Sequence, residues 1–158
     1  MISYRHFFLM VLLPVIAVIF FSCDSKRFFE ENQRIEKGTW DNNHKVRFVV
    51  AINDTVSAYD FFVNVRNDAD YPFSNLYFFI RTILPDGRIA WDTVECRLAD
   101  DYGKWLGTGM GSVKFNRFFF QQGVRLRQCG NYVFEFEQAM RVRELKGIRD
   151  VGLRIEKE

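Results

Sequence analysis

The sequence predicts an all-β fold: a single β-sandwich, jelly-roll or immunoglobulin-like, of about eight antiparallel strands. Apolar residues recur with a period of two from Trp40 onward, as they do along half-buried strands. Clusters of Asn, Asp, Pro and Gly separate these stretches, and no segment has a strong helical period. Phe supplies 18 of the 158 residues, which suits a β-rich core. Short strands divided by turn signals are typical of a sandwich.

The first strands are expected at residues 46–52 and 59–66, where apolar and other residues alternate. Residues 75–84 are apolar on both faces, which indicates a central strand covered on two sides. A tight turn follows at 85–87 because Pro85 fixes φ and Gly87 accepts positive φ. The returning strand then forms a hairpin and places Val94, Cys96 and Leu98 on one face.

The second half begins with a Gly-rich irregular segment at 99–111. Further strands are expected at 113–120, 124–127, 132–137 and 151–155. Residues 138–145 could instead form one or two helical turns. The apolar side of each strand predicts the core: Phe48, Phe61, Phe78, Ile80, Phe134, Phe136, Leu153 and Ile155.

The N-terminus has the layout of a secretory signal peptide. The cationic Arg5 and His6 precede an uncharged apolar run at 7–21, and the small Ser22 precedes Cys23. The motif FFSC at 20–23 resembles a bacterial lipobox, although Phe20 stands where that motif prefers Leu. This resemblance implies that Cys23 is acylated and becomes the first residue of the mature chain. The alternative is an uncleaved transmembrane helix, but the run falls short of the roughly 20 residues that span a bilayer.

Three regions are therefore expected: a lipoprotein signal peptide at 1–22, a lipid-anchored tether at 23–38 and the sandwich at 39–158. Removal of the signal leaves 158 − 22 = 136 residues, the size of one domain. The mature charge is 21 − 20 = +1, with both signs interspersed, which gives no electrostatic case for nucleic-acid binding. The mature chain is expected outside the cytoplasm and held at a membrane.

The sequence offers little support for catalysis. His44 is the only histidine after processing, and it lies in a polar turn. CxxC and HExxH motifs are absent, so neither a metal site nor a cofactor is expected. The glycines at 107–111 lack the Lys-Ser/Thr of a phosphate loop, and the acids at 67–70 lack an EF-hand continuation. Asp86, Asp100 and Asp101 could form a glycosidase-like carboxylate pair, but loop acids are commonly solvated.

Cysteines and tryptophans leave two further alternatives open. Cys96 and Cys129 are a candidate disulfide in an oxidising compartment, or two separate buried thiols. Trp91 and Trp105 could form a sugar-stacking platform, or pack in the core or at its rim. Trp105 is the better ligand candidate because it lies in the Gly-rich loop.

Several segments together resemble the gliding motility lipoprotein GldH family of Bacteroidota. They are YPFSNLYFFI (71–80), PDG (85–87), DTVEC (92–96), LAD (98–100), GKWLGTG (103–109), FEQAMR (136–141) and GIRDVGLRIEK (147–157). The resemblance runs from the signal to the C-terminus, and its last two blocks are the most specific. It implies a non-enzymatic accessory of the gliding machinery, which is coupled to type IX secretion, and supplies no catalytic residues.

On this interpretation the protein sits in the cell membrane or outer membrane through a lipid on Cys23, facing the periplasm or the cell surface. It acts on envelope proteins of the gliding or secretion apparatus, and a small-molecule ligand is not expected. The alternative is a carbohydrate-binding sandwich. Lys104, Trp105 and Arg141 are the candidate partner-binding residues because their segments do not alternate like strands. Alternatively, Trp105 and Met140 plug the ends of the sandwich.

Overall fold

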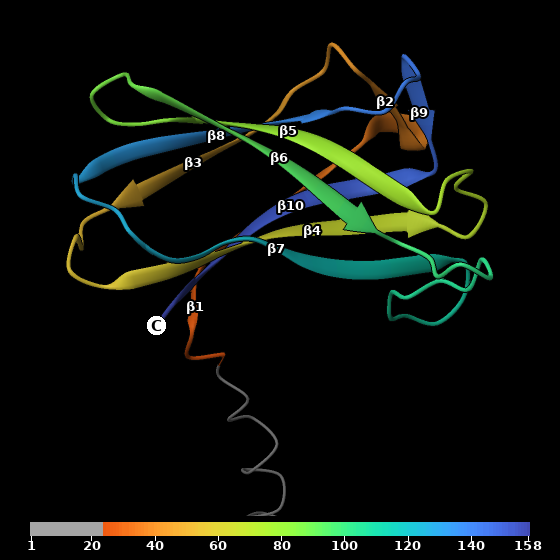
Figure 1. The fold of residues 1–158 in the computed structure, drawn as a ribbon, viewed down its shortest axis with the longest axis horizontal. Coiled ribbons are helices and arrows are strands. Elements are labelled where there is room, and N and C mark those ends of the chain that lie inside the picture. Colours follow the sequence, from red (N-terminus) through yellow and green to blue (C-terminus); the bar gives the residue numbers. More distant parts are fainter. Residues whose placement is uncertain (1–23) are drawn as a thin grey trace, which may run out of the picture.

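A computed structural model describes residues 24–158 as a β-sandwich of two antiparallel four-stranded sheets (Figure 1). One sheet has the order β1-β10-β4-β7 and the other β3-β8-β5-β6, while β2 and β9 form a small separate pair. The elements are β1 Arg27–Arg34, the 3₁₀ turn Glu36–Gly38, β2 Thr39–Asp41, β3 Val46–Ile52, β4 Ala58–Asp68, β5 Asn75–Ile83, β6 Ile89–Arg97, β7 Val113–Arg125, β8 Gly130–Gln138, β9 Glu144–Lys146 and β10 Ile148–Lys157. The predicted sandwich class is confirmed.

The core lies between the two sheets and is largely aromatic. Along β3, inward Val46, Phe48, Val50 and Ile52 are buried while the residues between them are exposed. Rings from opposite sheets meet in the middle, with centroids 5.6 Å apart for Phe61 and Phe134. All eight predicted core residues are at most 2% exposed. Alternation therefore identified the buried face of each of these strands.

The segment after β8 differs from the expected helical turns: it is an irregular loop followed by the short strand β9. The Gln138 side chain explains the difference. Its Nε2 donates to the carbonyls of Val142 and Arg143, at 2.8 and 3.3 Å, while its Oε1 accepts from the Met140 N–H at 2.9 Å. A buried amide thus satisfies the backbone groups that a helix would otherwise pair. The strands expected at 113–120 and 124–127 are one bulged strand, β7.

The prediction of a tether at 23–38 is wrong for most of that segment. Arg27–Arg34 forms strand β1, which pairs along its whole length with β10. The Lys157 N–H also donates to the Lys26 carbonyl at 2.9 Å, so the last strand binds the chain ahead of β1. The signal peptide and Cys23 lie outside the described residues. Within residues 24–158, no helix is long and apolar enough to cross a membrane.

The candidate disulfide between Cys96 and Cys129 is not formed: both are free thiols. Cys96 is buried opposite Leu76, at the start of β5, and burial raises the pKa of its thiol. Cys129 is exposed near the opposite end of that sheet, beside Gly130, and its Sγ lies 3.6 Å from the Asn53 carbonyl. The two cysteines therefore lie at opposite ends of the sheet.

Phe134→Ala is expected to lower the free energy of unfolding by about 3 to 5 kcal/mol, because it empties a fully packed site between the sheets. Phe79→Ala is the matched control, since Phe79 lies on the outer face of the same sheet and is 44% exposed. Chemical denaturation of both variants measures the difference. Equal losses for the two phenylalanines would contradict the assignment of the core.

Candidate functional surfaces

The outer face of the β1-β10-β4-β7 sheet carries a charge cluster around one buried arginine, Arg154, whose side chain is 4% exposed. Its guanidinium donates to Asp24, Glu30 and Glu156 at 2.5, 2.6 and 2.6 Å. Arg117 of β7 joins the same cluster by donating to Glu30 at 3.0 Å. The cluster therefore ties the first described residue to three strands.

The cluster keeps its acids ionised. The hydrogen bond from Arg154 lowers the pKa of the Asp24 carboxyl. Burial opposes the same effect at Glu30, but hydrogen bonds from Arg154 and Asn64 still leave the pKa of Glu30 below its usual value. The pKa of Arg154 is raised, against the effect of its burial, by these carboxylates. Each partner thus stabilises the charged form of the other.

A glycine makes the close packing of this face possible. Gly152 of β10 lies between Asn32 of β1 and Asn64 of β4. A Cβ built on Gly152 would lie 2.0 Å from Asn32 Oδ1, so any side chain there would displace the amide. The space left by Gly152 lets the Asn32 amide extend across β10 toward Asn64.

Arg154→Met is expected to lower the free energy of unfolding at pH 7 by about 3 to 5 kcal/mol, because it leaves the half-buried Glu30 without the buried cation that it pairs with. The pKa values of Asp24 and Glu30 are depressed in the folded state, so their contribution is present above the ordinary carboxyl pKa of about 4 and is lost below it. The difference between variant and wild type should therefore shrink as the pH falls toward 3.

Denaturant unfolding at several pH values measures this dependence. Arg97→Met is the control, because its ion pair with Asp101 is exposed on both sides and should contribute less than about 1 kcal/mol. A pH-independent loss in Arg154→Met would assign its effect to packing and not to charge.

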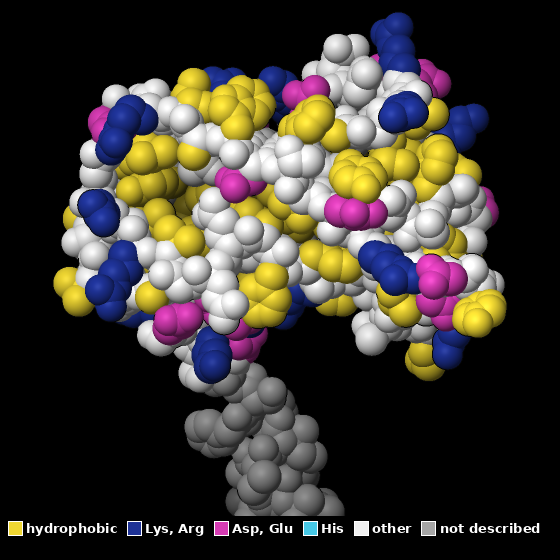
Figure 2. Space-filling model, in the orientation of Figure 1, with side chains coloured by type: hydrophobic (Ala, Val, Ile, Leu, Met, Phe, Trp, Pro, Cys, Tyr) yellow, Lys and Arg dark blue, Asp and Glu magenta, His cyan; other side chains and the backbone are white. Residues whose placement is uncertain are grey.

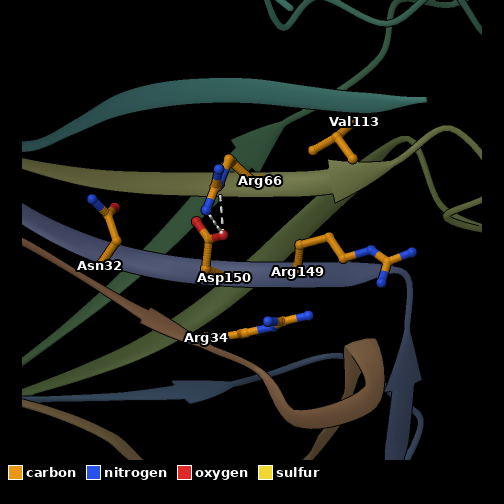
Figure 3. A pocket seen from close by; sticks show the side chains of 6 residues that line it. All are labelled: Asn32, Arg34, Arg66, Val113, Arg149 and Asp150. Atoms are coloured by element: carbon orange, nitrogen blue, oxygen red, sulfur yellow. Dashed lines mark hydrogen bonds and ion pairs between the residues drawn. The ribbon is translucent and has the colours of Figure 1, made fainter. Parts of the chain in front are cut away.

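A second polar site on this sheet is a hollow of about 360 Å³ between β1, β4, β7 and β10 (Figure 3). Three arginines line it, but two are already paired. Arg66 donates to Asp150 at 2.6 Å, which raises the pKa of Arg66, and Arg149 donates to Asp68 at 2.7 Å. Within residues 24–158 only Arg34 of the three has no ion-pair partner. The hollow thus has little uncompensated charge.

The candidate partner-binding residues lie at the end of the sandwich where β4 leads into β5. Trp105 is half-buried against the core, with its ring 6.4 Å from that of Tyr71. Met140 is also half-buried, and its Sδ lies 3.5 Å from the Tyr77 N. Lys104 and Arg141 are exposed. Trp105 and Met140 pack as end plugs would, while the cations beside them face solvent.

The glycosidase hypothesis gains no geometric support, because each of its acids already has a structural partner in its own turn, in the adjoining strand or in a neighbouring loop. Asp100 accepts from the backbone N–H groups of Tyr102 and Lys104 at 3.0 and 2.9 Å. Asp101 pairs with Arg97. Asp86 accepts from Gln128 and from Arg88, which lowers its pKa to about 2. All three acids are therefore engaged in local structural contacts.

Other proposed chemical sites are also dispersed. His44 is exposed, and its carbonyl accepts a hydrogen bond from Trp40 Nε1 at 2.8 Å. Across residues 24–158, no group of three His, Cys, Asp or Glu side chains could hold a metal ion. Trp91 lies on an outer face, 63% exposed, while Trp105 packs inward, so the two tryptophans do not share a platform.

These observations define a β-sandwich domain whose first described residue, Asp24, is bound by Arg154 on the outer face of the β1-β10-β4-β7 sheet. The chain belongs to the GldH lipoprotein family, whose model matches residues 27–155. It is 37% identical over 147 residues to a gliding motility lipoprotein GldH homolog of Christiangramia forsetii, covering 89% of this chain and 90% of the relative. It is 32% identical over 154 residues to the gliding motility lipoprotein GldH of Flavobacterium johnsoniae, covering 93% and 95%.

Comparison with solved structures does not extend this family assignment. A chain of infectious bursal disease virus has a TM-score of 0.36 at 12% identity, and covers 84% of this chain and 30% of its own length. A CBM35 module of Cellvibrio japonicus has a TM-score of 0.32 at 13% identity, with 84% and 88% covered. Scores of this size carry no argument about function. Family membership supports the predicted gliding-motility lipoprotein, and with it a membrane anchor.

Proposed function

We propose that this protein is a non-enzymatic accessory of the gliding machinery, associated with type IX secretion, that acts through protein contacts while a lipid on Cys23 holds it at the membrane. The observation that supports this best is the position of the anchor. Three residues separate Cys23 from β1, and the first of them, Asp24, is bound by the buried Arg154. An anchor at Cys23 would thus hold the sandwich directly at the membrane surface.

The physical basis of the anchor is the burial of acyl chains, at roughly 0.8 kcal/mol per CH₂. Several chains on one cysteine would hold the domain stably, whereas one chain alone gives marginal binding. The protein would lie at the cell membrane or the outer membrane, facing the periplasm or the cell surface.

Cys23→Ser is expected to abolish lipid attachment, because the thiol is the acceptor, and to release or misprocess the protein. Metabolic labelling with a palmitate analogue measures attachment. Ser22→Ala is the control, since it keeps a small residue before the cysteine and should label normally. Equal labelling of Cys23→Ser and the wild type would refute Cys23 as the lipidation site.

The exposed cations at the far end of the sandwich are the first candidate for the protein contact. Lys104 and Arg141 border the half-buried Trp105 and Met140, so a partner could pair with the cations and cover the aromatic and sulfur-containing side chains. Arginine and aromatic residues are enriched where binding energy concentrates. The plug interpretation of Trp105 and Met140 is compatible with this surface, because both side chains are only partly buried.

Lys104→Ala combined with Arg141→Ala is expected to leave the melting temperature unchanged, since both side chains are exposed, and to reduce recovery of crosslinked complexes from native membranes at least tenfold. Arg34→Ala is the control, because Arg34 is also exposed and unpaired within residues 24–158. Recovery equal to the control would remove this surface from the proposed function.

A further inference from the structure

The two sheets are open along one side, where the edge strands β6 and β7 face each other (Figure 1). Gln121 of β7 donates to Asp92 of β6 at 3.0 Å and closes the middle of this opening. Beyond that bridge, where β6 begins and β7 ends, a hollow of about 330 Å³ remains. Figure 2 shows a hollow with an apolar floor at this end of the molecule, with cationic side chains on its rim.

The floor of the hollow is formed by apolar side chains from two strands and two loops. Leu84 follows β5, Val124 is at the end of β7, Leu126 is in the next loop and Tyr132 is on β8. Tyr132 is buried, while the three aliphatic residues are half-buried against the core. Their exposed parts are the apolar surface that an occupant would cover.

The rim carries a positive charge that the protein does not neutralise. Arg88, Arg125 and Arg127 line the hollow. Arg88 pairs with Asp86 at 2.7 Å. Neither Arg125 nor Arg127 has an ion pair or a side-chain hydrogen bond within the described part of the chain. The arginine hollow around Arg66 and Arg149 differs in this respect, because its cations are mostly paired internally.

One buried polar atom in the lining also lacks a partner. Gln128 donates through Nε2 to the Asp86 carboxylate at 2.7 Å, which fixes the amide orientation because a carboxylate there only accepts. Its Oε1 is buried and accepts no hydrogen bond within residues 24–158. A buried carbonyl without a donor destabilises a structure, so an occupant with an N–H group would offset that cost.

We propose that this hollow receives an apolar side chain from a partner protein segment that also carries carboxylates, which pair with Arg125 and Arg127. The inference rests on the proposed function through protein contacts and names the chemistry of one such contact. An apolar anchor in a pocket with a charged rim is a common source of binding energy at interfaces. The hollow is at the lower end of the range that encloses small molecules, about 300 Å³, and it is open, which favours a single side chain.

The test uses the full-length lipoprotein in native membranes, with a photoreactive benzoylphenylalanine at Gln122, an exposed residue beside the lining. The crosslinked peptide is sequenced by mass spectrometry. We expect a protein segment with an apolar residue flanked by Asp or Glu. An adduct on lipid, an adduct on a segment without acidic residues, or no adduct would each overturn the proposal.

Charge variants provide the second measurement. The double variant R125E/R127E should lower the adduct yield at least tenfold, whereas R125K/R127K should keep it within about threefold because the charge remains. The control R34E/K37E makes the same change in net charge at exposed residues in β1 and the turn after it. Equal yields from R125E/R127E and R34E/K37E would overturn the assignment.

A crosslinker at Leu106, in the loop that carries Lys104, separates this proposal from the broader one. Leu106 is 53% exposed and lies at the other end of the sandwich. Protein adducts at Leu106 without any at Gln122 would refute the proposal that the hollow binds a partner, and would leave the proposed function through protein contacts intact. The absence of protein adducts from both positions would refute both.

Discussion

The β1-β10-β4-β7 sheet depends on the ion pairs that the buried guanidinium of Arg154 makes. A charge that is 4% exposed must be balanced by nearby acids, and Asp24, Glu30 and Glu156 supply that balance. Because these acids lie on β1, on β10 and ahead of β1, the requirement for charge balance holds the N-terminal strand against the last strand. The chain therefore enters the sandwich as soon as the described structure begins.

This constraint has a consequence for how a membrane anchor would act. A flexible tether would let the domain turn freely, whereas a chain bound from Asp24 onward would give the sandwich a preferred orientation if Cys23 carries the proposed lipid. The β6–β7 hollow lies at the end of the sandwich where Lys157 meets Lys26, three residues after the proposed lipidation site in the sequence. Lys104 and Arg141 lie at the opposite end. The two candidate contact surfaces would thus lie at different distances from the membrane.

The three arginine sites, around Arg154, around Arg66 and beside Arg125, differ in how far their charge is compensated. Arg154 is balanced by three acids and is a structural cation, while Arg66 and Arg149 each have one partner. Arg125 and Arg127 have none within residues 24–158, and they border apolar surface. Protein contacts use uncompensated charge next to partly accessible apolar side chains. This combination distinguishes the hollow from the other two arginine sites.

The sandwich class and the inward face of each predicted strand could be read from the sequence, because alternation and turn chemistry are local properties. The family could be recognised from short motifs in the same way. Phe48 and Phe134 could be placed in the core from their neighbours alone. Features that depend on contacts between distant residues became visible only in the folded chain. Strand β1 is mostly polar, and its acid Glu30 is stabilised by an arginine 124 positions away. The separation of Cys96 from Cys129 and the hollow beside Arg125 likewise arise only when strands pair, because local periodicity contains no information about register between remote segments.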